Sequence, residues 1–201
     1  MKKIASILLI ITLIFSVSGC SHEENLETEK NNQVSEINNN IKKEESPKIK
    51  EIQKGETITL NDYCEFTIND INFGKTISPS NPKGLYTFYE SKDEKEILLD
   101  SVIEVKSLLS EEKMAEEFLE VKVLHNNKYE YGVNSSIEYD DGSDFTYTNI
   151  TPIGPSSNGM LHFIALVPKN VENDNKLLVI MIKANNEEFK YNIRQSSMEN
   201  W

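Results

Sequence analysis

The sequence predicts an all-β fold, a sandwich or a barrel, from about residue 53 onward. Three observations support this prediction. Short segments in which apolar and polar residues alternate recur between residues 57 and 194, as they do along strands that bury one face. Clusters of Gly, Asn, Asp and Pro separate these segments at the short intervals typical of antiparallel strands. No long segment has the apolar spacing of an amphipathic helix, and the sequence contains no internal repeat.

The first predicted strands can be followed in order along the chain. They cover residues 57–60, 63–73, 85–91 and 97–108. The alternation in the second strand slips at Asn69-Asp70, which indicates a bend or a bulge. Residues 76–84 form a turn-rich loop before the third strand. The side chains of the fourth strand that we expect to face the core are Leu99, Ile103 and Val105.

A short helical turn is predicted next, with Ser110 as its cap and Glu111 and Glu112 at its positive end. The remaining strands are predicted at residues 118–124, 129–139, 145–150, 160–167, 176–183 and 188–194. Segments 160–167 and 176–183 are the most apolar, so we expect them to be central. The residues predicted to point into one core are Val121, Val123, Phe163, Ala165, Leu178 and Ile180.

The start of the chain is of a different kind. Two lysines precede an uncharged apolar run that ends in Val17-Ser18-Gly19-Cys20. A basic start, a short apolar segment and a small-residue cleavage site make up a secretory signal peptide. An uncleaved anchor is one alternative, although the run is shorter than the roughly 20 residues that a transmembrane helix needs. An ordinary secretory signal, with Cys20 incidental, is the other.

This motif resembles the lipobox of bacterial lipoproteins. The resemblance implies that residues 1–19 are a signal peptide and that Cys20 becomes the first residue and carries a diacylglyceryl group with fatty acids such as palmitate. Two acyl chains are enough for stable anchoring. We therefore expect a lipid-anchored protein on the extracytoplasmic face of the cell membrane, in a Gram-positive bacterium.

Residues 20–52 are rich in Asn, Glu and Lys and contain few apolar residues, which predicts a disordered spacer that ends where the folded domain, residues 53–201, begins. The spacing of Val34, Ile37 and Ile41 leaves a transient helix as an alternative. The whole chain has 21 basic and 33 acidic residues and a net charge of −12. Cleavage removes two lysines and leaves 19 basic residues against 33 acidic ones, a net charge near −14. Such a chain repels phosphates, so a nucleic acid partner is not expected.

The order of segments resembles a known family. A polar lipoprotein spacer is followed by GETITL, by strands ending in INDINF and VIEVKSL, and later by GMLHFIALVPKN and KLLVIMIK. This order is similar to the Ig-like extracellular domain of unknown function in Gram-positive lipoproteins, a domain related in fold to the mycobacterial immunoprotective secreted antigens. The match covers residues 54–195, with Ser107 where the family usually has Asn and an inserted acidic segment at residues 110–117. It implies an Ig-like antiparallel β-sandwich and no defined chemistry.

Residues that could carry chemistry are few. With Cys20 lipidated, Cys64 has no disulfide partner, and its alternation with Phe66 and Ile68 predicts a buried apolar position. His22, His125 and His162 show no metal-ligand spacing and are interpreted as unrelated. No nucleophile motif, phosphate-binding loop or dinucleotide fingerprint is present. We therefore expect no catalytic residues and no cofactor.

The strongest metal candidate is the Asp140–Asp144 loop, in which Asp140, Asp141 and Asp144 surround Gly142. Oxygen ligands on a glycine-bearing loop suit calcium, but the spacing of an EF-hand is absent and Asp-Gly is also a common hairpin turn. We assign no metal ligands, and the sequence leaves calcium binding by this loop open.

Two classes of function remain. The first is a non-catalytic binding module whose partner is a protein, a peptide or a cell-wall component. The second is a calcium-dependent accessory protein or an enzyme that acts on a cell-envelope substrate. A deep pocket with convergent polar groups favours the second class, and a shallow surface favours the first.

Overall fold

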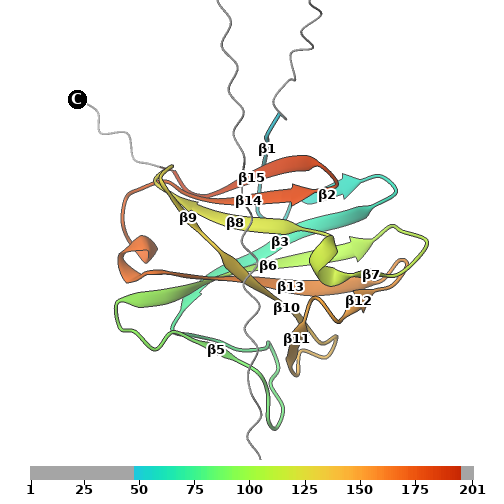
Figure 1. Cartoon of the computed structure of the whole chain (residues 1–201), viewed down its shortest axis with the longest axis horizontal. Coiled ribbons are helices and arrows are strands. Elements are labelled where there is room, and N and C mark those ends of the chain that lie inside the picture. The colour runs from blue at the N-terminus through green and yellow to red at the C-terminus, as the bar shows by residue number, and fades with distance from the viewer. Residues whose placement is uncertain (1–47, 196–201) are drawn as a thin grey trace, which may run out of the picture. The chain divides into compact units, whose positions relative to one another are not determined.

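Two β-sheets packed face to face form the folded part of the chain (Figure 1). The computed structural model describes residues 48–195. The predicted signal peptide, the lipid site Cys20 and the spacer as far as residue 47 lie outside these residues. Within residues 48–195, no helix is long and apolar enough to span a bilayer.

The two sheets differ in size. Sheet A has five strands, which from edge to edge are β1 (Lys50–Ile52), β15 (Glu187–Arg194), β14 (Leu178–Ala184), β8 (Glu120–His125) and β9 (Tyr129–Tyr131). Sheet B has six, which are β11 (Phe145–Tyr147), β10 (Val133–Glu138), β13 (Asn158–Pro168), β6 (Glu96–Ser107), β3 (Cys64–Gly74) and β2 (Thr57–Leu60). All strand pairs are antiparallel except β1 with β15. The all-β sandwich predicted from the sequence is confirmed.

Smaller elements lie outside the two sheets. β4 (Thr76–Ile77) pairs with β5 (Tyr89–Glu90), and β7 (Lys113–Met114) pairs with β12 (Pro152–Ile153). Two single turns of 3₁₀-helix follow other strands, η1 (Ala115–Glu117) and η2 (Lys169–Glu172).

Most predicted strands are present, and the two most apolar ones are central. β13 lies between β10 and β6, and β14 lies between β15 and β8. The bulge predicted at Asn69-Asp70 is also confirmed, because the register of β3 against β6 shifts between Ile68 and Asp70.

Three sequence predictions are wrong in detail. Residues 129–139 are not one strand, because β9 pairs with β8 in sheet A whereas β10 pairs with β13 in sheet B. The predicted strand at residues 85–91 is reduced to β5. The helical turn begins after Met114 without a side-chain cap, and Ser110 does not start it, because residues 113–114 pair as β7 first.

The start of the folded domain also lies earlier than predicted. Residues 50–52, assigned to the spacer, form β1 and pair with residues 189–191 of β15. Ile52 is 2% exposed and belongs to the same buried cluster as Phe189. A strand of three residues with one buried side chain is too short to show alternation in the sequence.

The core lies between the sheets in two neighbouring clusters. One contains Phe163, Val121 and Ile180, and the other contains Ala165, Val123 and Leu178. Ile71, Val133 and Ile193 pack against both clusters and connect them. All six predicted core residues are therefore buried between the sheets. The three inward positions predicted on β6, which are Leu99, Ile103 and Val105, are buried as well.

Cys64 lies in this core, as predicted. It is fully buried beside Phe66 and Ile68. Burial raises the pKa of its thiol to about 12, and the charge of Glu65 adds to the effect. The thiol is therefore protonated at physiological pH and is unreactive in the folded protein.

The first prediction concerns core packing. Phe163→Ala should lower the free energy of unfolding by about 3–5 kcal/mol, because it removes a buried ring and leaves a cavity. Lys122→Ala is the matched control, since Lys122 lies on the exposed face of β8 and only contacts the exposed Glu120 and Glu130. Urea denaturation followed by far-UV circular dichroism measures the free energy of unfolding of both variants. A small effect of Phe163→Ala, similar to that of Lys122→Ala, would contradict the assignment of the core.

Candidate functional site

Part of the outer face of sheet B is covered by a third layer. We call residues 76–90, which run from β4 through a long loop to β5, the cover segment (Figure 1). Ile77 and Tyr89 of this segment pack against an apolar cluster on the outer face of the sheet, formed by Leu98, Phe145 and Ile164. Sheet B is therefore buried on both faces where the cover segment lies.

The bulge in β3 decides which side chains reach this outer face. Before the bulge, Ile68 pairs with Ile103 and faces the core. Asn69 has no partner on β6, and Asp70 pairs with Val102 and Asn72 with Asp100. Because the extra residue reverses the alternation, Asp70 and Asn72 lie on the outer face while Ile71 and Phe73 pack on the core side.

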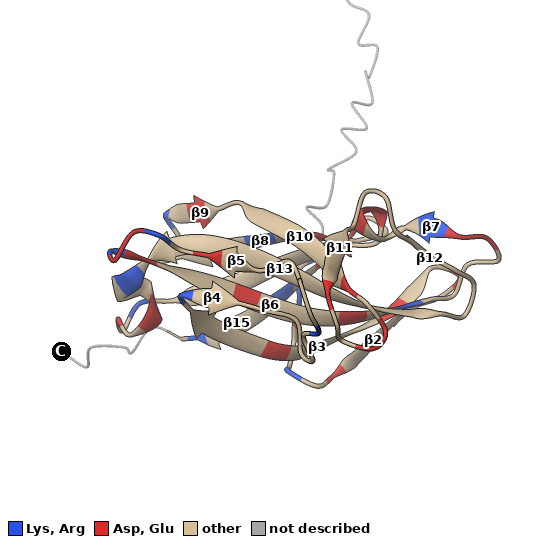
Figure 2. Ribbon diagram, turned by 90° about the horizontal axis from the view of Figure 1, so that it is seen from below, with Lys and Arg blue, Asp and Glu red and all other residues tan. Residues whose placement is uncertain are grey.

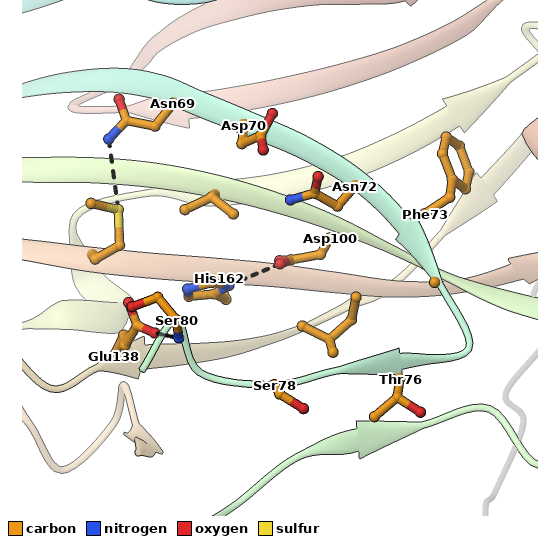
Figure 3. A pocket seen from close by; sticks show the side chains of 14 residues that line it. Asn69, Asp70, Asn72, Phe73, Thr76, Ser78, Ser80, Asp100, Glu138 and His162 are labelled. Carbon is orange, nitrogen blue, oxygen red and sulfur yellow. Dashed lines mark hydrogen bonds and ion pairs between the residues drawn. The ribbon is translucent and has the colours of Figure 1, made fainter. Parts of the chain in front are cut away.

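A recess of about 510 Å³ lies between this face and the cover segment (Figure 3). Its polar lining comes from several elements: Asn69, Asp70 and Asn72 of β3, Asp100 of β6, Glu138 of β10, His162 of β13, and Thr76, Ser78 and Ser80 of the cover segment. Ile77, Val102 and Met160 supply apolar walls. A recess of this size, with mixed walls and convergent polar groups, is typical of a small-ligand site.

The centre of the recess is a buried pair of polar residues. Nδ1 of His162 lies 2.9 Å from Oδ2 of Asp100. The two residues are 6% and 2% exposed. The ring of His162 also packs at 59° against Phe145, with 4.8 Å between the ring centres. Figure 3 shows both polar side chains in the space between the sheet and β4.

Each member of this pair keeps one polar atom without a partner. Nε2 of His162 and Oδ1 of Asp100 are buried and form no hydrogen bond. A buried polar atom without a partner costs about 1–3 kcal/mol, so native proteins contain few of them. Two such atoms in neighbouring side chains that line one recess indicate a site whose partner is a ligand.

The loop predicted as a calcium candidate holds the cover segment in place. Oδ1 of Asp144 accepts the backbone N–H of Thr87 at 2.6 Å, and the carbonyl oxygen of Gly142 accepts that of Asn81 at 2.8 Å. Nζ of Lys83 lies 3.2 Å from Oδ2 of Asp141. Glu138 accepts a hydrogen bond from the backbone N–H of Ser80.

These contacts explain the ionisation of the loop. Hydrogen bonds from Ser143 and Lys83 lower the pKa of Asp141, and the backbone N–H groups of Thr87 and Phe145 lower that of Asp144. Within residues 48–195, no three His, Cys, Asp or Glu side chains gather as metal ligands would. The contacts of Asp141 and Asp144 therefore give these two carboxylates a part in holding the cover segment.

The histidines predicted to be unrelated have separate environments. His22 lies outside the described residues. His125, which lies just beyond the predicted strand at residues 118–124, is the last residue of β8 and is 3% exposed. Its Nε2 lies 2.8 Å from Asp174, which Arg194 also contacts at 2.6 Å. Arg194 further donates to the carbonyl oxygens of three residues, Val171, Glu172 and Lys176, so this cluster fixes η2 to β15.

The outer face also places a serine beside His162. Ser136 is directly opposite His162 in the pairing of β10 with β13. Its hydroxyl, however, is bonded to the hydroxyl of Tyr89, and it is not within hydrogen-bond distance of Nε2 of His162. This arrangement differs from a nucleophile–base pair, in which the base contacts the hydroxyl.

Comparison with one solved structure supports the β-sandwich fold. The chain is similar to an uncharacterized β-sandwich protein from Clostridium difficile 630, with a TM-score of 0.68 and 28% identity, over 76% of this chain and 99% of that one. It is also similar to a conserved hypothetical protein from Bacillus anthracis, with a TM-score of 0.49 and 14% identity, over 70% of this chain and 93% of that one. No protein-family model and no curated protein matches the chain.

Sequence reasoning missed the Asp100–His162 pair. Both residues alternate with core positions, Leu99 and Phe163, so their outward direction follows from the sequence. The register of β6 on β13, in which Asp100 lies opposite Ile164, does not follow from the sequence. The usable signal was an aspartate directly after the apolar run Ile97-Leu98-Leu99 and a histidine in the apolar strand β13, because a buried polar residue needs a partner.

The second prediction concerns the attachment of the cover segment at Gly142. Gly142 has φ +70°, and a Cβ there would lie 2.3 Å from Oγ of Ser80. Gly142→Ala should therefore destabilise the protein by more than the roughly 1–3 kcal/mol of backbone strain alone. Gly84→Ala is the matched control, because Gly84 has φ +65° and its Cβ would meet no atom within 4 Å.

Hydrogen exchange at the amides of Asn81 and Thr87 provides the local measurement. Both amides should exchange faster in the Gly142→Ala protein than in the Gly84→Ala protein. Equal protection in the two variants would show that the contact between the loops does not hold the cover segment.

Proposed function

We propose that this protein is an extracytoplasmic lipoprotein, anchored to the cell membrane through Cys20, and that its sandwich is a non-catalytic binding module. The recess beneath the cover segment is the binding site. The observation that carries the proposal is the buried Asp100–His162 pair with two unpartnered polar atoms in the wall of that recess.

The membrane part of the proposal is supported by the sequence of the N-terminus. The two lysines, the apolar run and the motif Val17-Ser18-Gly19-Cys20 follow the order of a lipoprotein signal. The similar β-sandwich protein comes from a Gram-positive bacterium, which agrees with this source and with the Ig-like domain of Gram-positive lipoproteins. A relation in fold to the mycobacterial immunoprotective secreted antigens belongs to the same proposal.

The binding part is supported by how the recess is built. Its polar groups come from four strands of sheet B, and the packed core behind the sheet holds them in place. The cover segment supplies the opposite wall and is held by loop hydrogen bonds and by the packing of Ile77 and Tyr89 on the sheet. A rigid floor with a loop-borne wall is a common arrangement for recognition, because loops vary while the scaffold is conserved in shape.

Convergent polar groups in a recess are the feature expected of the second class of function, an accessory protein or an enzyme, but a hydrolase is supported less well than a binding module. The Asp100–His162 geometry is that of a base held by a carboxylate, but the neighbouring hydroxyl of Ser136 is bonded to Tyr89. The calcium-dependent alternative has no gathered ligand set within residues 48–195. Binding of a protein, a peptide or a cell-wall component is therefore the function that we propose, and a nucleic acid is excluded from the proposal by the net charge of −12.

The third prediction concerns the anchor. Cys20→Ala should abolish incorporation of radiolabelled palmitate and should release the protein from the membrane fraction or stall its processing. Cys64→Ala is the matched control, since Cys64 is buried in the core and is not available for acylation. Label that persists in the Cys20→Ala protein would contradict the assignment of the lipid site.

The fourth prediction tests the recess as the binding site in intact cells. A photocrosslinking amino acid at Asn72, which is exposed and lines the recess, should capture a ligand or partner. The same amino acid at Lys183, exposed on the outer face of sheet A, should not. Capture should fall when Glu138→Gln is added to the Asn72 variant. Equal capture from both positions would show that the recess is not the site.

A further inference from the structure

We infer that the recess recognises an organic cation with N–H donors, a primary ammonium group carried on a ligand with a short apolar part. This inference rests on the proposed function, because it specifies the ligand of the same site. It follows from the acceptors in the recess, from the charge around them and from the apolar walls.

The first step concerns the two unpartnered atoms. In the tautomer that carries its proton on Nδ1, His162 donates to Oδ2 of Asp100, which matches a carboxylate that only accepts hydrogen bonds. In the neutral imidazole, Nε2 is then an acceptor, as is Oδ1 of Asp100. Both free atoms therefore require a donor from the ligand, and a group with several N–H bonds can satisfy the two together.

The second step concerns the charge. Asp70, Asp100 and Glu138 line the recess, and no lysine or arginine of residues 48–195 does. A second recess, of about 390 Å³, shares Ser80, Glu138 and Met160 with the first. The acidic residues that it adds are Glu104, Asp140 and Asp141, again without a lysine or arginine from the described part of the chain.

The two recesses therefore form a continuous acidic path along the outer face of sheet B. Figure 2 shows acidic residues along β6 and in the loops beside it. The nearest lysines are engaged at its edge, where Lys54 contacts Asp70 and Lys83 contacts Asp141. Carboxylates set against a sheet that excludes water attract a cation more strongly than the same groups do in solvent.

The third step separates an organic cation from a metal ion. A metal ion needs several ligating side chains around one point, and residues 48–195 hold no group of three. The walls formed by Ile77, Val102 and Met160 instead suit an apolar stem next to the charged group. The side chain of lysine has this form, as has an aliphatic amine.

Access to the pair requires movement. Nε2 of His162 and Oδ1 of Asp100 are out of contact with solvent, so a ligand reaches them only when residues that line the recess shift. The cover segment is the wall that is not part of sheet B, and Ser80 connects it to Glu138 by one hydrogen bond. A ligand cation that pairs with the carboxylate of Glu138 competes with the hydrogen bond from Ser80.

The test measures binding to the mature lipidated chain in detergent micelles by isothermal titration calorimetry. Two amine probes are used, the peptide acetyl-Gly-Lys-Gly-amide and free spermidine, and they distinguish a lysine side chain from a small amine. There are two comparison probes. One is the same peptide with its lysine acetylated, and the other is calcium chloride. We expect heat of binding from at least one amine probe and none from the acetylated peptide.

Variants of the recess locate the binding. Glu138→Gln keeps an acceptor for Ser80 but removes the charge, and Asp100→Asn removes the charge at the centre. Loss of one charged hydrogen bond should weaken binding about 10-fold or more. His162→Asn should also weaken it, because an asparagine amide can still donate to Asp100 but lacks the Nε2 acceptor. The matched controls Asp62→Asn and Glu112→Gln, at exposed positions away from the recess, should leave the affinity unchanged.

Each contrary result has a definite meaning. Equal binding of the lysine and acetyl-lysine peptides, lost in Glu138→Gln, would overturn the cation inference while the recess remained a binding site. Binding of calcium to the unmodified sequence that is lost in Glu138→Gln would also overturn the inference of an organic cation. Amine binding unchanged in Glu138→Gln would assign it to the acidic surface in general and overturn the inference. Absence of binding by both amines, together with crosslinking at Asn72, would overturn the inference and leave the proposed function.

Folding is checked for every variant by thermal denaturation. If Asp100→Asn does not fold, Glu138→Gln decides the outcome, because Glu138 lies at the border of the recess and is only partly buried.

Discussion

One unpaired residue, Asn69, sets the arrangement on which both the core and the recess depend. Side chains of a strand alternate between its two faces, so without an extra residue the polar Asp70 and Asn72 would point into the core and Ile71 and Phe73 away from it. The bulge reverses this order at the point where β3 passes the middle of β6. Its consequence is that Asn72 lies opposite Asp100 on the outer face, while the apolar residues of both halves of β3 stay between the sheets.

Burial of the outer face by the cover segment shields the Asp100–His162 pair from solvent. An aspartate and a histidine on the solvent side of a sheet are ordinary and interact weakly. Here the cover segment packs Ile77 and Tyr89 over the neighbouring Leu98 and Ile164, and the same layer removes the pair from water. Because a charge or polar group in such surroundings must be compensated, the cover segment converts a surface pair into a site with unmet hydrogen bonds.

The parts of the structure that the sequence predicted depend on local periodicity. The strand class, the central position of β13 and β14, the bulge at Asn69-Asp70 and the buried Cys64 all follow from alternation over a few residues. The parts that it did not predict depend on pairing between distant segments. Ile52 becomes part of a strand only because Tyr191 lies beside it, and His162 meets Asp100 only through the register of β13 on β6. Residues 129–139 likewise divide into two strands because β9 pairs with β8 in sheet A and β10 pairs with β13 in sheet B.

The pairing of β1 with β15 has a consequence for the time at which the fold can be completed. Residues 50–52 are made early, whereas their partners, residues 189–191, come near the end of the chain. The edge of sheet A therefore stays open until almost the whole polypeptide is present, and contacts between such distant segments close slowly. In the interval Ile52 lacks the side chain of Phe189 that covers it in the fold, and the high negative charge of the chain opposes association of one copy with another.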